Sequence, residues 1–441
     1  MYKKIKIQII SRTFPLKNNA GRDAYILDFV NYLRQVNCEV EYVSINPSAT
    51  DKYPWCIIPS TLGKPRNVRV RNNLQIGRIL LRFNVLSDWI AGPLRLIFHK
   101  LPQRLKNIFR LTIQKFKKKS NQLINKTQNL RDWQDVLATS EEIAFAKTQI
   151  DRFKPDVIVV NYIYLAKILD ILESDKNILK AILTHDVFHQ RNALFQKIGV
   201  VMGDGNWNLE AETAQLEKAQ VLLAIQKEDA QIFKQMVPQA RVINMPISAM
   251  SYSHNIKQVP GRCLFVGSRT EHNNYGLQWF LENVWLQIIE KVPHCSLHVC
   301  GSVCDGIQES FPNVRFLGRV NDLQPEYSAA EVCLVPLLAG SGLKIKLVEA
   351  MSYSRACVST SVGIQGLPEI AGKTAIVADT VDDFVAAMHT LLTDSEKRQW
   401  MERQAYKYVK ENLSSKSSYQ PFVDYIHQYF QQQAEVHFSQ K

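Results

Sequence analysis

The sequence predicts an α/β protein made of two Rossmann-like domains, each a doubly wound parallel sheet, that face each other across a cleft. Short, almost continuously apolar segments alternate with helical stretches, a pattern typical of parallel strands covered on both faces. The alternation occurs in two runs, residues 1–245 and residues 262–412, and the stretch 246–261 has the prolines and glycine of a linker. Residues 413–441 are expected to form a C-terminal helix that packs back across the cleft.

The first run opens with a β-α-β unit, in which a strand at 5–10 leads into a helix at 22–35 and a strand at 40–45. No G-x-G-x-x-G follows the first strand, so the dinucleotide-binding fingerprint is missing. Gly21 and Arg22 start the helix, where they either line the acceptor side of the cleft or only cap the helix. Further strands are expected at DVIVVNY, KAILTHD, VLLAI and RVINM, with helices at 133–152, 207–220 and 228–235.

The second run carries the stretch that points most directly to chemistry. A strand at 332–336 is followed by a loop with two glycines and a helix at 343–352. Such a loop presents backbone N–H groups and the positive end of the helix dipole, which together bind phosphate. Lys344 and Lys346 add positive charge, and Glu349 is placed to reach ribose hydroxyls. The stretch therefore predicts a pocket for a nucleotide diphosphate. Further strands are expected at RCLFVG, SLHVCG, VRFLG, 356–360 and TAIVA, with helices at 275–289, from 381 and from 395.

The net charge of +13 is concentrated between residues 62 and 130, where sixteen Lys and Arg accompany a single acid, Asp88. Apolar residues recur there at helical spacing from Leu94 to Phe116, so a basic helical insertion is expected over about 48–130. Residues 92–120 are predicted to bind an anionic membrane surface. A helical hairpin that packs on the domain is the alternative, and nucleic acid is not expected as a partner because no recognition motif is present.

The composition, with 46% hydrophobic and 22% charged residues, is that of a soluble globular protein. The N-terminal stretch MYKKIKIQII is interpreted as a strand and not as a signal peptide, and Asp88 and Arg95 interrupt the best candidate for a membrane span. The eight scattered cysteines suggest a reducing cytoplasm, so the protein is expected on the inner face of the cell membrane. The group around Cys295, His298 and Cys300 alternates like a strand, which favours core packing over a metal site.

The second run resembles the C-terminal half of family 4 glycosyltransferases. The similarity lies in a series of motifs in the expected order: VG…WFLENVW, LGRV, AAEVCLVPL, GSGLKIKLVEAM and STSVGIQGLP. It extends over about residues 262–412, while LTHDVFHQRN and VLLAIQKEDAQIF resemble members that build bacterial surface polysaccharides.

The resemblance implies the GT-B fold and sugar transfer from a nucleotide-diphosphate sugar, with retention at the anomeric carbon. It implies that Glu349 binds the donor ribose and that Lys344 and Lys346 face the diphosphate. The donor-binding positions that it implies are Gly267, Ser268, Arg269, Gly340, Ser341, Gly342, Leu343, Lys344, Lys346, Glu349 and Gly363.

The chain departs from the family at two places. Ser341 stands where the first of two glutamates seven residues apart is usual, and the basic pair after V-G is only partly present. The first departure leaves the contact to the donor sugar open. The second gives Lys344 a larger share of the phosphate charge, so Lys344 is predicted to be catalytic.

His185 and Asp186 end a strand of the first run, in the motif LTHD. Strand ends of open sheets bind ligands, so both are predicted to be catalytic, through the donor sugar or the acceptor. The alternative is that Asp186 caps a helix and His185 is an ordinary loop residue. His189 and Arg191 are weaker candidates.

The predicted function is that of a retaining, peripheral membrane glycosyltransferase of polysaccharide synthesis, whose acceptor is a saccharide or a lipid-linked saccharide. No D-x-D motif is present to hold a divalent cation, so we expect no metal and no cofactor besides the donor. Two alternatives remain: a nucleotide-sugar epimerase of the same fold, and an inactive binding or scaffold protein.

Overall fold

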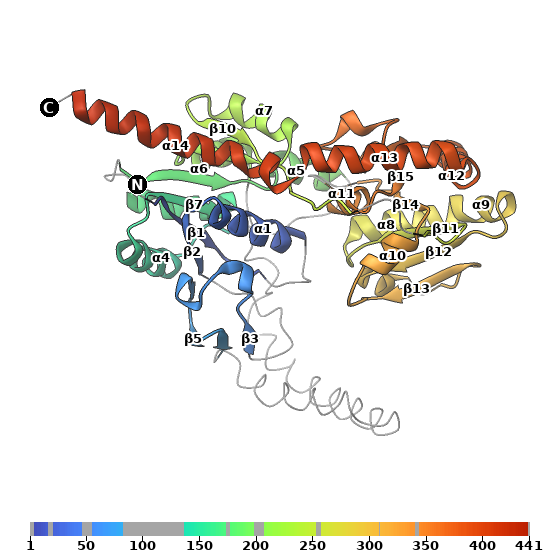
Figure 1. The fold of residues 1–441 in the computed structure, drawn as a ribbon, viewed down its shortest axis with the longest axis horizontal. Coiled ribbons are helices and arrows are strands. Elements are labelled where there is room, and N and C mark those ends of the chain that lie inside the picture. The colour runs from blue at the N-terminus through green and yellow to red at the C-terminus, as the bar shows by residue number, and fades with distance from the viewer. Residues whose placement is uncertain are drawn as a thin grey trace, which may run out of the picture. The chain divides into compact units, whose positions relative to one another are not determined.

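The fold is described by a computed structural model (Figure 1). The structure describes residues 4–15, 21–45, 55–82, 136–172, 177–197, 207–252, 257–307, 309–339 and 344–439. It divides into two compact units, which are described separately. Unit 1 comprises residues 1–183 and 199–221, and unit 2 comprises residues 184–198 and 222–441. Two parallel α/β sheets confirm the predicted fold class, whereas the predicted domain boundaries stay a prediction.

The first sheet has seven strands in the order β10-β9-β8-β7-β1-β2-β4. The strands are β1 (Lys6–Ser11), β2 (Glu39–Ser44), β4 (Val68–Val70), β7 (Val157–Asn161), β8 (Leu179–Leu183), β9 (Val221–Ala224) and β10 (Arg241–Asn244). Strand β1 lies inside the sheet and pairs in parallel with β2 and β7, so that Ile7 lies opposite Val40 on one side and Val157 on the other. All three of these side chains are buried, as a sheet covered on both faces requires.

Two helices near this sheet are shorter than sequence periodicity suggests, and two others match it to within one residue at each end. The helices near the sheet are α1 (Gly21–Gln35), α4 (Ser140–Phe153), the 3₁₀ segment η4 (Ile163–Leu172), α5 (Phe188–Lys197), α6 (Leu209–Leu216) and α7 (Lys227–Met236). Helix α4 was expected from residue 133, but it starts at Ser140 because Thr139 and Glu142 form a reciprocal capping box. Glu142 also accepts hydrogen bonds from the buried guanidinium of Arg12, which follows β1.

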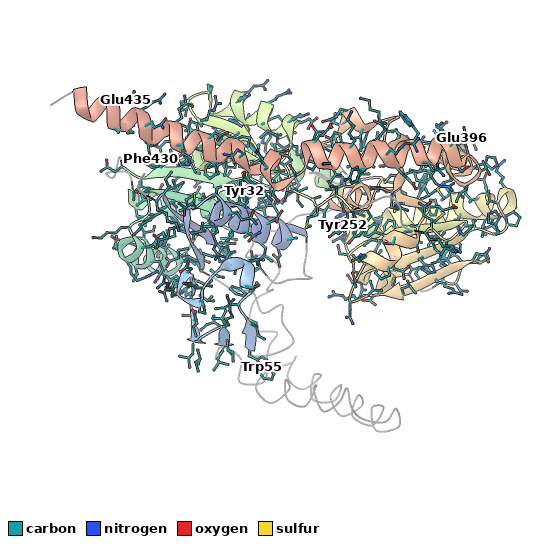
Figure 2. The ribbon with its side chains drawn as sticks, viewed as in Figure 1. Tyr32, Trp55, Tyr252, Glu396, Phe430 and Glu435 are labelled. Atoms are coloured by element: carbon teal, nitrogen blue, oxygen red, sulfur yellow. The ribbon has the colours of Figure 1, made fainter. Side chains whose placement is uncertain are left out.

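The described part of the expected helical insertion is β-structure. Strands β3 (Trp55–Ile57), β5 (Asn73–Ile76) and β6 (Ile79–Arg82) form a small antiparallel sheet, and β4 extends the first sheet. The 3₁₀ turns η1 (Ser60–Leu62) and η2 (Pro65–Asn67) connect them, and Figure 2 shows Trp55 on this sheet. The helical prediction thus fails for residues 55–82, and residues 92–120 lie outside the described residues.

The second sheet has six strands in the order β13-β12-β11-β14-β15-β16. They are β11 (Arg262–Val266), β12 (Ser296–Cys300), β13 (Val314–Gly318), β14 (Val332–Val335), β15 (Ala356–Ser359) and β16 (Ala375–Val377). The helices of this half are α8 (Glu271–Phe280), α9 (Leu286–Lys291), α10 (Gln324–Ala329), α11 (Ile345–Ser352), α12 (Val381–Thr393), α13 (Ser395–Asn412) and α14 (Ser415–Ser439). A π-helical turn, Leu281–Trp285, joins α8 to α9. The helix expected at 275–289 begins four residues earlier, at Glu271.

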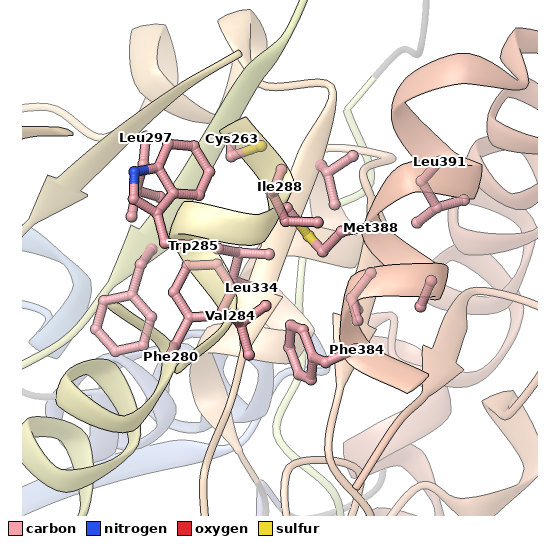
Figure 3. Close-up of a cluster of buried hydrophobic side chains, with 14 of the residues drawn as sticks. Cys263, Phe280, Val284, Trp285, Ile288, Leu297, Leu334, Phe384, Met388 and Leu391 are labelled. Carbon is pink, nitrogen blue, oxygen red and sulfur yellow. The ribbon is translucent and has the colours of Figure 1, made fainter. Parts of the chain in front are cut away.

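The core of this half packs aromatic rings from α8 and α12 between the sheet and its helices (Figure 3). The Phe280 and Phe384 rings meet edge to face, with 5.6 Å between centroids. Trp285 is fully buried, and its indole N–H donates to the Pro312 carbonyl at 2.9 Å. Cys295 lies in the same core, and His298 Nδ1 contacts Glu326 at 2.6 Å.

Among the helices that the structure describes, none has both the length and the apolar character that a membrane crossing requires.

Candidate active site

The strand order of the second sheet indicates where a ligand would bind, and the strand ends at that point are called the crevice below. From β11 the chain continues to β12 and β13 on one side, and then returns to β14, β15 and β16 on the other. The strand order therefore reverses between the neighbouring strands β11 and β14: the strands that follow β11 are added on one side, and those that follow β14 on the other. In open α/β sheets, ligands bind at the carboxyl ends of such strands. The loop that begins at Gly267 and the helix α11 follow these two strands.

Glycines allow the loop after β11 and helix α8 to approach neighbouring backbone. A Cβ on Gly301, which has a φ of +103°, would lie 2.1 Å from the Gly267 carbonyl oxygen. A Cβ on Gly276 of α8 would lie 2.3 Å from the Pro336 carbonyl oxygen, just after β14. The middle of α8 therefore lies close to the end of β14.

Lys346 is the most strongly perturbed cation of the crevice. Its Nζ donates to the Asn273 side-chain oxygen and lies 4.8 Å from the centroid of the Phe265 ring. Burial and the charge of Lys344 lower the pKa of Lys346 to about 7, against a smaller opposing effect of Glu349. A buried cation with a lowered pKa gains most from an anionic ligand, because the ligand restores the charged form.

Lys344 occupies the N-cap position of α11 and is only 7% exposed. Its Nζ donates to the Gln365 side-chain oxygen at 3.3 Å. Burial lowers the pKa of Lys344 to about 8, although the carboxylates of Asp186 and Asp229 in the same unit act in the opposite direction. Lys344 and Lys346 lie close together, since the charge of Lys344 lowers the pKa of Lys346. Their role in donor binding stays a prediction.

His272 joins this group, although sequence reasoning did not select it. Burial, Lys346 and Lys344 together lower the pKa of His272 to about 4, in that order of importance. Its Nε2 lies 3.1 Å from the Thr270 hydroxyl. The next residue, Asn273, donates to the Ser268 carbonyl at 2.9 Å and thereby holds the loop after β11. The sequence carries no local signal for His272, because the two lysines that lie near it are more than 70 residues further along the chain.

Ser268 and Arg269 lie in this loop and are exposed, and the Arg269 backbone N–H donates to the Ser302 hydroxyl at 2.9 Å. On the other side, Gly363 sits so close to β14 that a Cβ would lie 2.2 Å from the Ser359 hydroxyl and 2.6 Å from the Val335 carbonyl oxygen. Gly363 N–H donates to the Thr360 hydroxyl at 3.0 Å. Both loops thus border the strand ends that carry the lysines.

Glu349 accepts a hydrogen bond from the Tyr327 hydroxyl, with 3.1 Å between the oxygens. Burial raises the pKa of Glu349, while the Tyr327 hydrogen bond and Lys346 act against that rise. The Tyr327 ring stacks on Tyr353 at 4.9 Å, and Tyr353 stacks on Tyr252 at 4.5 Å. This stack fixes Tyr327 and, through it, the carboxylate, so Tyr327 is a positioning residue that the sequence did not reveal.

If Glu349 binds the donor ribose as predicted, replacing Tyr327 with Phe should weaken that contact without unfolding the protein. The loss of one hydrogen bond to a charged group predicts a rise of about tenfold in donor KM. A donor that lacks a ribose hydroxyl should be penalised less in this variant than in the wild type. Tyr429→Phe on α14 is the matched control, and an unchanged KM in Tyr327→Phe would contradict the assignment.

The other residues predicted from the sequence follow β8, open α1 or lie outside the described residues. His185 and Asp186 follow β8 and are half-buried, and Arg191 donates to the Asp186 carboxylate at 3.4 Å while its guanidinium lies 4.1 Å from the Phe188 ring centroid. Gly21 and Arg22 open α1, but their side chains are not described. The four residues 340–343, which include Ser341, lie outside the described residues. These roles therefore stay predictions.

Within the part of the chain that the structure describes, no three His, Cys, Asp or Glu side chains are grouped so that they could hold a metal ion. The positive charge at these strand ends comes from Lys344 and Lys346, while His272, with a pKa of about 4, is neutral near pH 7 and can offer only a hydrogen bond. Glu349 adds an acceptor for hydroxyl groups close to these lysines. Together they match a phosphorylated, hydroxyl-bearing ligand.

Comparison with known proteins agrees with this arrangement. Residues 260–394 match the family model described as glycosyl transferases group 1. An uncharacterized 44.6 kDa protein in the cps region of Klebsiella pneumoniae is 29% identical over 168 residues, which is 35% of this chain and 42% of that protein. The match thus spans less than half the length of this relative.

Solved structures share the fold over almost the whole chain. TarM is 10% identical with a TM-score of 0.63, and the match covers 96% of this chain and 99% of that one. Sucrose-phosphate synthase from Thermosynechococcus elongatus is 14% identical, and the pneumococcal O-GlcNAc transferase GtfA, in complex with UDP and GlcNAc, is 10% identical. Both have a TM-score of 0.60 and matches that cover 97% of this chain and 99% of theirs. At these identities the likeness establishes the fold.

Proposed function

We propose that this chain, whose residues 260–394 match the group 1 glycosyltransferase family model and whose fold is GT-B, transfers a sugar from a nucleotide-diphosphate sugar to a saccharide acceptor. The observation that carries the proposal is the pair of buried lysines, Lys344 and Lys346, beside the hydrogen-bonded carboxylate of Glu349. The lysines fit a diphosphate, and the carboxylate fits the ribose hydroxyls.

The reaction needs positive charge at the leaving group. The bond between the anomeric carbon and the phosphate oxygen breaks, and its electron pair stays on the nucleoside diphosphate. The acceptor oxygen forms the new bond to that carbon, and its hydroxyl proton passes to the departing phosphate or to solvent. Fixed cations that face the diphosphate stabilise the charge that develops in the transition state. Lys344 and Lys346 are placed for this role because they are buried at the strand ends and need little reorganisation.

We propose further that transfer proceeds with retention at the anomeric carbon and without a metal ion. Metal independence is supported by the lysines, which supply the charge that a divalent cation would otherwise provide. Full activity in excess EDTA is the expected result, measured as sugar transfer by the purified chain. Activity that disappears in EDTA and returns with Mn²⁺ would contradict it. Proton NMR of the fresh product distinguishes retention from inversion.

The acceptor that we propose is a growing or lipid-linked saccharide of a surface polysaccharide, made at the inner face of the cell membrane. The relative in a Klebsiella cps region supports this setting. The basic sequence between residues 62 and 130 supports attachment to anionic lipid through residues 92–120. Flotation of the full chain and of a chain without residues 92–120 on anionic vesicles tests the attachment, and equal flotation would contradict it.

The donor is identified by a thermal-shift screen against UDP, GDP, ADP and TDP. A nucleotide that binds only the native state raises the apparent melting temperature. The matching nucleotide sugars are then incubated with and without saccharide acceptors. Transfer to an acceptor supports the proposal. Conversion of the donor into an epimer without acceptor, or no reaction with any donor, would contradict it.

A further inference from the structure

The small antiparallel sheet of unit 1 has one face that is apolar throughout. Strand β6 lies between β3 and β5, and residues directly opposite one another share a face of the sheet. Ile79 lies opposite both Ile57 and Ile76, and Leu81 lies opposite both Trp55 and Leu74. Side chains two residues apart along a strand also share a face. All six side chains on this face are therefore apolar.

The other face of the sheet is the one that packs on the protein. Cys56 and Leu80, which alternate with the six apolar residues, are 8% and 1% exposed. Gln75, on the same face, donates to the Pro65 carbonyl at 2.7 Å and attaches the sheet to turn η2. The face with Cys56, Leu80 and Gln75 therefore packs against the rest of the unit, and the apolar face is the opposite one.

The apolar face is open to solvent. Ile57 is 66% exposed, Ile76 58%, Leu74 48% and Ile79 46%, while Trp55 and Leu81 are half-buried. Single exposed aliphatic residues are common on protein surfaces, whereas these six apolar side chains form one contiguous face, which makes it a candidate binding surface. Trp55 lies on β3 at this sheet (Figure 2), and tryptophan is enriched where proteins meet the lipid headgroup region.

The charged residues near this face are positive, which favours a partner with a negatively charged surface. Residues 55–82 contain Lys64, Arg66, Arg69, Arg71, Arg78 and Arg82 and no Asp or Glu. Arg69 and Arg71 form ion pairs with Glu41 and Glu141. The guanidinium of Arg78 instead donates to the carbonyls of Ile58 and Gly63, which holds its positive charge beside the sheet. None of the ion pairs between described residues includes Arg78. An apolar face with cations nearby fits an anionic bilayer, where buried apolar area and headgroup attraction add.

The size of the face argues against a second copy of the chain as its partner. Three strands about 4.8 Å apart and four residues long cover roughly 14 Å by 14 Å, or about 200 Å². A stable protein interface buries about 800 Å² on each partner. A surface of this size can insert into the headgroup region of a bilayer, but it is too small to stabilise a dimer by itself.

We propose that the apolar face of the β3–β6–β5 sheet inserts into the headgroup region of an anionic phospholipid bilayer. The sheet would orient the acceptor-side domain on the membrane that carries the proposed lipid-linked acceptor, so this inference rests on the proposed function. It assigns membrane contact to residues 55–82, separately from the basic segment 92–120.

Vesicle sedimentation of the full chain tests the insertion. The double variant Ile57→Asp/Ile79→Asp should bind vesicles of phosphatidylcholine and phosphatidylglycerol at least about tenfold more weakly than the wild type. Leu286→Asp, on an exposed apolar residue of α9, is the matched control and should bind like the wild type. Transfer to a water-soluble acceptor should be unchanged in both, which separates failure of this inference from failure of the proposed transferase.

A fluorescent label on Ile57→Cys gives a second measurement that does not depend on a destabilising change. Seven of the eight native cysteines are buried and the other is half-buried, so the label should favour the new site. Emission should shift to the blue when the anionic vesicles are added. Equal vesicle binding by the aspartate variant, or a label already shielded before lipid is added, would overturn the proposal. A wild-type dimer that the aspartate variant converts to a monomer, with vesicle binding unchanged, would equally overturn it.

Discussion

Lys346→Met should reduce sugar transfer by about two to three orders of magnitude, because it removes a fixed cation from the site where the leaving diphosphate gains charge. Methionine keeps the volume and the apolar contact with Phe265, so the fold should be retained. Lys344→Met should have an effect of the same order. The measurement is kcat/KM for the donor, with Lys373→Met on an exposed residue of the same unit as control.

The same substitution should increase stability in the absence of ligand. Lys346 has a pKa lowered from 10.5 to about 7 by burial, so at pH 7 to 10 the unfolded chain binds more protons at this residue than the folded chain. Stability contributed by this group therefore rises with pH over that range, and below it the buried charge destabilises the fold. Lys346→Met removes that cost. A melting temperature that rises while transfer falls would show that the lysine is kept for binding and not for folding.

Gly276→Ala should impair both folding and donor binding. The new Cβ would lie 2.3 Å from the Pro336 carbonyl oxygen, and a backbone atom at the end of β14 cannot move aside easily. Overpacking of this kind costs about 1 to 3 kcal/mol. The displacement should also move the first turn of α8, and with it His272 and Asn273, away from the lysines. Denaturant unfolding and nucleotide titration measure the two effects.

Gln278→Ala, on an exposed position of the same helix, is the control and should change neither quantity appreciably. If Gly276→Ala matched the wild type in both measurements, the close approach of α8 to β14 would not be what holds the crevice in shape. If stability fell while nucleotide affinity stayed the same, the helix would support the fold but not the site.

The fold class could be predicted from the sequence, and the lysines could be selected as candidates, because both depend on local pattern. Near-continuous apolar strands and a loop before Lys344 can be recognised without knowing the neighbours in space. His272 and Tyr327 could not be found in this way. Their roles depend on the pairing of β11 with β14 and on the stacking of Tyr327 with Tyr353, which join residues far apart in the chain.

The small sheet escaped prediction for a different reason. Strand β3 has three residues and strands β5 and β6 have four each, so alternation is too short to stand out beside a strong helical period further along. The burial of the lysines was also out of reach, since a sequence shows charge but not the removal of water around it. The pKa of Lys346 therefore comes from the structure alone.

Binding of a sugar nucleotide's diphosphate by the buried Lys344 and Lys346 can be measured directly. Isothermal titration of the nucleotide at pH 8, in buffers of different ionisation enthalpy, tests it most directly. At that pH the nucleotide phosphates are ionised, since the second pKa of a phosphate is about 6. Lys346 is largely neutral in the free protein.

We expect the wild type to take up about one proton for each nucleotide bound, as the diphosphate restores the charge of the lysines, and Lys346→Met to lose most of that uptake. Nucleotide affinity should also fall as the pH rises through 7 to 8 and beyond, because the free lysines lose their protons. Binding with no proton uptake, or with equal affinity in Lys346→Met, would contradict the account.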